Sequence, residues 1–256
     1  MRRRGDPYAS AGDQRTLPRP TLPSSNAARA PEDDGDPPTT SIAPSPTLRL
    51  ARPALRSRVV PVSADVRLLS VATQHLARLG PKRVTVVGVA AEAGMTHANV
   101  YRYFPSKDAL LDAVASRWLR EVEAELGRIA DAPDPADDKI ERLLTALASV
   151  QRETLARDPN LFAVHLDATV ASRPIARRHR VRLRSLVERV VEEGIGVGAF
   201  VTRDRERAIA YIFDASYRFT HPLAIQHDAD VPGDLIEARL GAVIQAIQRV
   251  LRTGTL

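Results

Sequence analysis

The sequence predicts an all-α fold, and three observations lead to this class. Apolar residues recur at spacings of three and four from Val62 almost to the end of the chain, which is the period of one helix face. Glycine and proline punctuate these periodic segments, for example at Gly80, Pro159 and Pro174. No stretch alternates apolar and polar residues over a convincing length, as a half-buried strand would. We therefore expect about nine helices.

The expected helices follow from their apolar stripes and from the residues at their ends. The first begins near Val62 and ends before Gly80-Pro81. A long helix of about 24 residues continues through Ala130, a length natural for a rod between two domains. A polar, proline-containing linker follows at residues 131–137. Further helices are expected over residues 139–157, 159–170, 174–193, 205–219 and 234–251, with Gly194, Gly196 and Gly198 interrupting the pattern.

The segment 85–107 carries the most specific pattern, two short helices around a glycine. Thr85 can cap the first helix by accepting an unpaired backbone N–H. Gly94 follows as the residue that most easily takes the left-handed conformation that ends a helix. Thr96 can cap the second helix, which Pro105 stops. This is the layout of a helix-turn-helix, a motif that places its second helix in the major groove of DNA.

This segment resembles the DNA-binding domain of the tetracycline-repressor-like (TetR) family of bacterial transcription regulators. The residues that carry the resemblance are Thr85-Val86, Val89-Ala90, Ala93-Gly94 and Tyr101–Lys107, within a stretch from Val62 to Leu111. Gly88 inside the second helix departs from the family pattern, and it costs about 1 kcal/mol relative to Ala. The resemblance implies a homodimer on a pseudo-palindromic operator in double-stranded DNA, and a small-molecule effector bound in a larger helical domain.

The chain divides into three parts on this interpretation. Residues 61–108 form a three-helix DNA-binding domain, and residues 109–256 form a helical domain for ligand binding and dimerisation. Residues 1–60 hold ten of the nineteen prolines and little periodic apolar content, so we expect a disordered tail rich in Pro and Arg. Its arginines are able to touch phosphate, but Asp and Glu dilute them, and we favour a solvated tail without a role.

Two groups of residues are expected to contact DNA. The first group suits base edges, because Asn pairs with adenine and His meets guanine or a phosphate; it comprises His97 and Asn99. The second suits phosphates through hydroxyl, ammonium and helix N-terminal groups; it comprises Thr85, Thr96, Tyr101, Tyr103 and Lys107. The alternatives are that His97 and Asn99 are only exposed polar residues, that the two threonines serve as caps alone, and that Tyr103 packs on the core.

The effector site is expected in the larger domain, on residues of mixed aromatic and polar character. The resemblance places a ligand cavity beside the long connector helix, and small-molecule sites are mostly apolar with a few polar groups. The candidate ligand-binding residues are Trp118, Phe162, His165, Tyr211 and Tyr217. For Trp118 the alternative is ordinary core packing, and for His165 it is a structural hydrogen bond.

Composition narrows the function classes. There is no Cys, which excludes disulfides and thiolate metal sites, and no apolar run reaches the roughly 20 residues of a membrane span. The first residues show no secretory signal, so we expect a soluble, cytoplasmic protein. Net charge is +6, of which +4 lies in residues 1–60. A nearly balanced body disfavours a protein that packages DNA without sequence preference.

Enzymatic and metal sites find little support in the sequence. Gly194, Gly196 and Gly198 follow a helix, whereas a dinucleotide fingerprint follows a strand. His179 stands among arginines with no carboxylate close to it along the chain. The run from His227 to Asp230 is better explained as a polar loop than as a metal site. We expect no cofactor, no metal and no catalytic residue. The remaining alternative to a ligand-responsive repressor is a helical small-molecule-binding protein or enzyme without specific DNA binding.

Overall fold

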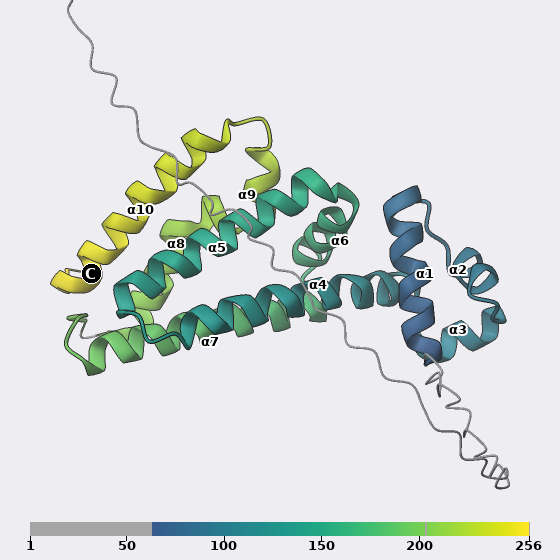
Figure 1. Ribbon diagram of the computed structural model, residues 1–256, viewed down its shortest axis with the longest axis horizontal. Helices are drawn as coiled ribbons and strands as arrows, with labels where there is room; N and C mark the ends of the chain where they lie inside the picture. Colours follow the sequence, from purple (N-terminus) through teal and green to yellow (C-terminus); the bar gives the residue numbers. More distant parts are fainter. Residues whose placement is uncertain (1–62, 203, 256) are drawn as a thin grey trace, which may run out of the picture. The chain divides into compact units, whose positions relative to one another are not determined.

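The protein is described by a computed structural model that covers residues 63–202 and 204–255, and within these ranges only helices and their connections occur (Figure 1). The predicted all-α class is confirmed. The expected tail, residues 1–60, lies outside the described residues. The helices are α1 (Ala64–Leu79), α2 (Val86–Glu92), α3 (His97–Tyr103), α4 (Lys107–Ala130), α5 (Ala136–Arg157), α6 (Pro159–Val170), α7 (Pro174–Gly196), α8 (Arg205–Thr220), α9 (Pro222–His227) and α10 (Gly233–Thr253).

Side-chain caps set the starts of α2, α3 and α4. The hydroxyls of Thr85, Thr96 and Ser106 each accept the backbone N–H three residues on, at 3.1, 3.3 and 3.0 Å. Each such bond satisfies one of the N–H groups that a helix leaves unpaired at its start, and it contributes about 1 kcal/mol. The caps expected at Thr85 and Thr96 are therefore present.

The described residues bury two large hydrophobic cores. The N-terminal core joins α1 to the helix-turn-helix and to the first half of α4, and residues such as Leu68, Val89 and Leu110 form its centre. The second core lies among α4, α5, α7, α8 and α10, and includes Ile140 and Ile212. Helix α4 takes part in both, because residues up to Leu119 belong to the first core and residues from Val122 belong to the second.

Helix α6 is a second connection between the two parts of the chain. Its Val164 and Ala168 are buried in the N-terminal core. At its start, the Asn160 side chain donates a hydrogen bond to the carbonyl of Ala77 in α1 at 3.1 Å. The α6–α7 connection is held to α4 by Arg173, whose guanidinium lies 3.1 Å from the Asp112 carboxylate.

The expected helices differ from the structure mainly at α5, which begins at Ala136 inside the expected linker 131–137, and at α9 and α7. Helix α9 was not expected; it is six residues long, too short for a periodic apolar stripe, and the His221 ring caps it by accepting the Leu223 N–H at 3.3 Å. Helix α7 was expected to end near Glu193 but continues to Gly196. The left-handed residue after it is Gly198, with φ of 74°.

Gly194 serves packing rather than helix termination. A Cβ built on Gly194 would lie 2.2 Å from Cδ2 of the Phe200 ring, whereas one on Gly196 would meet nothing within 4 Å. Phe200 is buried in the second core. The absence of a side chain at Gly194 thus lets the chain fold back after α7 and bury this ring.

We predict that Gly194→Ala destabilises the protein by about 1–3 kcal/mol, because the new methyl group overpacks the Phe200 ring. Gly196→Ala is the matched control, since the same methyl group has open space there and Ala favours a helix by up to about 1 kcal/mol. Denaturant unfolding followed by circular dichroism gives both free energies. Equal stability of the two variants would contradict the packing role of Gly194.

Candidate nucleic-acid interface and ligand cavity

Helices α2 and α3 are packed so that most of α3 faces outward. Helix α2 buries Val86, Val89 and Ala90, whereas within α3 only Val100 is buried. Between them Gly94 adopts a φ of 66°, and the Met95 N–H donates to the Ala90 carbonyl at 2.9 Å. Because the turn is tight, the side of α3 that faces away from α2 remains exposed, as a helix that enters a DNA groove must be.

The predicted base-contacting residues lie on this outward side. His97 is exposed and Asn99 is half-buried. The rings of His97 and Tyr101 meet edge to face with centroids 4.6 Å apart, so Tyr101 limits the orientations of the His97 ring. Such a restricted imidazole loses less side-chain entropy on binding.

The predicted phosphate-contacting residues surround the same helix. Thr85 and Thr96 are exposed at the starts of α2 and α3, where the helix N-termini favour anions. Tyr103 is 45% exposed, so the alternative that it packs on the core is wrong. The Lys107 ammonium donates to the carbonyl of Lys82 at 2.8 Å and keeps further N–H donors for a phosphate.

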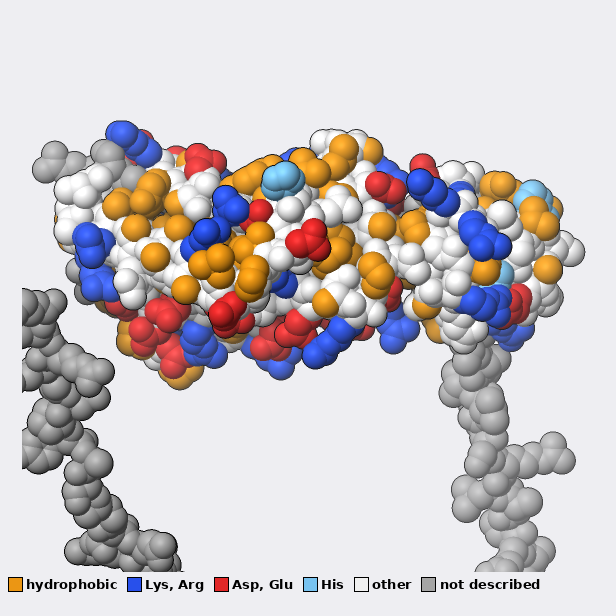
Figure 2. All heavy atoms as spheres, turned by 90° about the horizontal axis from the view of Figure 1, so that it is seen from above, with side chains coloured by type: hydrophobic (Ala, Val, Ile, Leu, Met, Phe, Trp, Pro, Cys, Tyr) orange, Lys and Arg blue, Asp and Glu red, His pale blue; other side chains and the backbone are white. Residues whose placement is uncertain are grey.

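Three basic residues beside the motif were not singled out from the sequence. Arg102 is exposed on α3, and Lys82 and Arg83 are exposed just before α2. Figure 2 shows several Lys and Arg side chains at the end of the molecule formed by α1–α3. The exposure of Arg102 could have been predicted from the sequence, because Val100 and Phe104 are the apolar residues that anchor this segment and Arg102 lies on a different face of the helix.

An ionic contact fixes α2 against α1. The buried His75 ring lies 2.5 Å from the Glu92 carboxylate, and the Arg78 guanidinium lies 3.2 Å from the same oxygen. The hydrogen bond from His75, followed by that from Arg78, lowers the pKa of Glu92. A Cβ on Gly88 would lie 3.0 Å from the Thr85 hydroxyl and 3.4 Å from the His75 ring, so this glycine, which departs from the family pattern, leaves room chiefly for the hydroxyl that caps α2.

A cavity of about 550 Å³ lies among α5–α9. Of the five predicted ligand-binding residues, His165 and Tyr217 line it. Trp118, Phe162 and Tyr211 are not among its lining residues. Trp118 packs edge to face behind His165 with ring centroids 5.3 Å apart, and Phe162 is 1% exposed in a separate apolar cluster. Tyr211 packs against the second core.

Three buried polar side chains line the cavity, namely Gln151, His165 and His179. The Gln151 amide nitrogen lies 3.4 Å from His165 Nε2, and His179 Nδ1 lies 2.7 Å from the Glu123 carboxylate. This second pair could not be predicted from the sequence, because 56 positions separate its members. Each of the three side chains also keeps one buried nitrogen or oxygen that has no hydrogen-bond partner in the described part of the chain.

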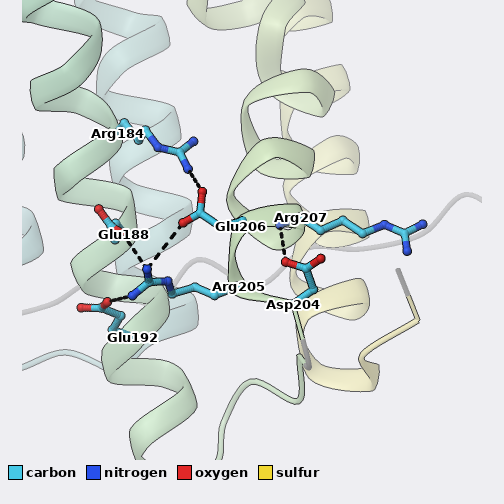
Figure 3. A network of polar contacts seen from close by, with 7 residues as sticks. All are labelled: Arg184, Glu188, Glu192, Asp204, Arg205, Glu206 and Arg207. Atoms are coloured by element: carbon cyan, nitrogen blue, oxygen red, sulfur yellow. Dashed lines mark hydrogen bonds and ion pairs between the residues drawn. The ribbon is translucent and has the colours of Figure 1, made fainter.

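One charged residue at the cavity, Arg184, belongs to an ion-pair network between α7 and α8 (Figure 3). Arg184 lines the cavity and pairs with Glu206. Arg205 pairs with Glu192 and lies 3.3 Å from Glu188. Arg180 also lines the cavity, and no ion pair involves it among the described residues. Burial and then the Arg180 charge lower the pKa of His221, whose ring stacks on Tyr217 at 4.4 Å.

The described residues hold no group of three or more His, Cys, Asp or Glu side chains arranged for a metal ion. Asp228, from the polar loop considered above, is engaged by the Arg218 guanidinium at 2.7 and 3.0 Å. Over the same residues, no helix combines the length and the apolar character that crossing a membrane requires.

Comparison with known proteins gives two family matches. Residues 68–114 match the family described as bacterial regulatory proteins, tetR family, and residues 136–252 match the tetracyclin repressor-like C-terminal domain. The chain is 32% identical over 116 residues to an HTH-type transcriptional regulator of Mycobacterium tuberculosis, covering 45% of this chain and 54% of that protein. It therefore spans about half the length of the first curated relatives it matches.

Other relatives are matched over more of their length. The HTH-type transcriptional regulator BetI of Stenotrophomonas maltophilia is 28% identical over 180 residues, covering 60% of this chain and 91% of that protein. Among solved structures, a Rhodococcus sp. RHA1 protein of unknown function superposes with a TM-score of 0.57 at 24% identity, covering 76% and 98% of the two chains. Thermus thermophilus FadR, in complex with lauroyl-CoA, gives 0.52 at 18% identity, covering 75% and 95%. These structures support the fold.

The burial of His165 predicts a specific acid sensitivity. Burial, followed by the charges of His179 and His221, lowers the pKa of His165 from 6.5 to about 3. In the folded protein the ring stays neutral, whereas in the unfolded chain it binds a proton below its ordinary pKa. Between these two pKa values the unfolded state holds more protons, so stability falls as the pH falls. The free energy of unfolding should drop by about 2 kcal/mol from pH 7 to pH 5 through this group alone.

We expect His165→Gln to remove that part of the pH dependence, and His227→Gln, a change at an exposed histidine, to retain it. Urea unfolding at a series of pH values from 7 to 5 measures the slopes. Parallel curves for the wild type and His165→Gln would show that this ring is not held neutral by the fold.

Proposed function

Because the chain belongs to the tetracycline-repressor family of bacterial transcription regulators, we propose that it binds a pseudo-palindromic operator as a homodimer and represses transcription in the cytoplasm. A small molecule in the α5–α9 cavity would lower its affinity for the operator. The observation that carries the proposal is the outward-facing α3, capped by Thr96 and surrounded by residues able to contact phosphate.

We assign the preference for a particular DNA sequence to α3, and the sequence-independent part of the DNA affinity to the residues around α3. The polar side chains of His97 and Asn99 are suited to base edges in the major groove. Thr85, Lys107 and the two tyrosines are suited to the phosphates on either side, and these contacts would fix the register without reading sequence. The balanced charge of the larger domain favours a protein that relies on such placed contacts.

Dimerisation is assigned to α8 and α10, which would form a four-helix bundle with the same helices of a second copy. Leu235 of α10 is 41% exposed, and Ala238, Ala242 and Ala246 follow it on exposed positions four residues apart. Small side chains allow helices to approach closely, and a two-fold axis through this contact would present two copies of α3 to a symmetric operator.

The coupling between cavity and DNA is assigned to α6. Its His165 and Thr169 line the cavity, while Val164 and Ala168 are buried in the N-terminal core. Neighbouring residues of one helix therefore contact the cavity and the core on which the helix-turn-helix is packed. A ligand that displaces α6 would also strain the contacts of Asn160 with α1 and of Arg173 with α4. Effector affinity and operator affinity would then be linked through a single two-state element.

Substitutions in the helix-turn-helix separate the roles of base and phosphate contacts. Asn99→Ala should cost about 1–3 kcal/mol on the preferred operator and relax preference at one base position. Lys107→Ala should weaken binding evenly across sequences and reduce the slope of log affinity against log salt by about one unit.

The operator is first obtained by selection from random DNA, and binding is then measured by fluorescence anisotropy at several salt concentrations. Gln226→Ala, an exposed change on α9, is the control. Unchanged affinity and preference in Asn99→Ala would place the reading face elsewhere. Failure to select any sequence from the pool would favour a small-molecule-binding protein without specific DNA binding.

A charged side chain introduced into the proposed interface tests whether α10 pairs the two copies. Ala242→Glu should convert the dimer to a monomer at micromolar concentration, because carboxylates would face each other across the two-fold axis. Ala124→Glu, the same change on an exposed position of α4, should leave the dimer intact. Sedimentation velocity gives the masses. A dimer that survives Ala242→Glu and dissociates with Ala124→Glu would show that another surface pairs the two chains.

A further inference from the structure

The α5–α9 cavity contains hydrogen-bonding groups that the protein itself does not satisfy. Gln151, His165 and His179 are 2%, 3% and 5% exposed. Gln151 Oε1, His165 Nδ1 and His179 Nε2 have no hydrogen-bond partner among the described residues. A buried polar atom without a partner costs on the order of 1–3 kcal/mol, and here three of them occur on side chains that line one cavity.

The pair formed by Gln151 and His165 determines what kind of group is missing. The amide nitrogen of Gln151 donates to His165 Nε2 at 3.4 Å, so the neutral ring carries its proton on Nδ1. This arrangement leaves one donor, His165 Nδ1–H, and one acceptor, Gln151 Oε1. If the amide is rotated by 180°, Gln151 Oε1 accepts a hydrogen bond from His165 Nε2–H. The free acceptor is then His165 Nδ1, and the free donor is the Gln151 NH₂ group. In either orientation the pair offers at least one free donor and one free acceptor.

His179 adds a third unsatisfied group. Its Nδ1 faces the Glu123 carboxylate at 2.7 Å, and because a carboxylate only accepts, this nitrogen carries the proton. This leaves Nε2, which accepts a hydrogen bond if the ring is neutral and donates one if the ring is protonated; a hydroxyl group suits either form. The His165 and His179 rings meet edge to face with centroids 5.7 Å apart, which brings the three unsatisfied groups into one region of the cavity.

The other walls favour an uncharged, largely apolar compound. Leu147, Leu183 and Phe213 line the same cavity, and its volume of about 550 Å³ accommodates a molecule of one or two rings. Of the two arginines at the cavity, Arg184 is paired with Glu206, whereas Arg180 has no ion pair among the described residues but is exposed. No Lys or Arg that lines the cavity is buried with Gln151 and His165, so an anionic group placed there would have no buried cation beside it.

We infer that the cavity takes a neutral, ring-sized organic compound with a hydroxyl group, which accepts a hydrogen bond from the Gln151–His165 pair and donates one to the pair or to His179. A hydroxyl both donates and accepts, so it satisfies unlike partners at once. A carboxylate only accepts and an ammonium only donates, so each would leave a buried group unpaired. The inference rests on the proposed function in taking this cavity as the effector site.

Three probes of similar shape test this assignment by calorimetry on the full chain. 2-Naphthol carries the hydroxyl, 2-methylnaphthalene replaces it with a methyl group, and 2-naphthoate replaces it with a carboxylate. We expect 2-naphthol to bind at least roughly tenfold more tightly than either of the others, which corresponds to about 1.4 kcal/mol. A hydroxyl that merely replaces an equally well-bonded water would give no such preference.

Variants locate the preference within the cavity. Gln151→Leu and His165→Phe remove polar atoms at similar volume, and each should reduce 2-naphthol binding to the level of 2-methylnaphthalene. Gln226→Leu, on an exposed position of α9, should keep the preference. The inference is overturned if the methyl compound binds as tightly as the naphthol in the unmodified protein, if the naphthol shows no saturable binding, or if the preference persists in both cavity variants. No DNA is present, so this outcome is independent of whether the chain binds an operator.

Discussion

Helix α4 is buried by two hydrophobic cores at once, and this double burial constrains how the two parts of the described chain act together. Its 24 residues span about 36 Å. Leu110 and Leu119 belong to the N-terminal core, and Val122 and Ile129 belong to the second. If the helix slid along its axis, one of these sets would become exposed to water. This exposure would cost a free energy of about 25 cal/mol for each Å² of apolar surface. The lower-cost motion is a tilt of the whole helix, which carries the helix-turn-helix with it.

Helix α6 connects the ligand cavity to the N-terminal core, so a change in the cavity is able to affect the tilt of α4. A helix of 12 residues places His165 on the cavity and Val164, its neighbour in sequence, in the N-terminal core. The connection that follows holds Ser172 at a φ of 49°, an uncommon conformation for a residue with a side chain, next to the Arg173–Asp112 contact. Burial raises the pKa of Asp112 more than Arg173 lowers it. The link between the sites thus contains strained and partly buried polar groups, which are sensitive to small displacements.

Local chemistry made the DNA-binding part of the sequence predictable, and non-local contacts limited the rest. A cap such as Thr85 or Thr96 acts on the N–H three residues away, and the stripes of α4, α5 and α10 repeat within a few residues, so both are visible in the sequence. Helix α9 has only six residues, which is too short for such a repeat. The cavity depends on Gln151, His165, His179 and Glu123, which come from four different helices, and no spacing along the chain brings them together. The resemblance, which places a cavity beside the connector helix, favoured Trp118, and aromatic character favoured Phe162; neither residue lines the cavity.

The central claim, that cavity and DNA-binding surface are coupled, is tested most directly by reciprocity. The dissociation constant of 2-naphthol is measured by calorimetry with the free protein and with the protein saturated by its selected operator, and the operator affinity is measured with and without 2-naphthol. Linkage requires that both affinities change by the same factor, and a factor of roughly 5–150 is ordinary for allosteric proteins. Weaker 2-naphthol binding to the operator complex, matched by equally weakened operator binding, is the predicted result. Tight binding of 2-naphthol that is the same with and without the operator would show that the cavity does not control DNA binding.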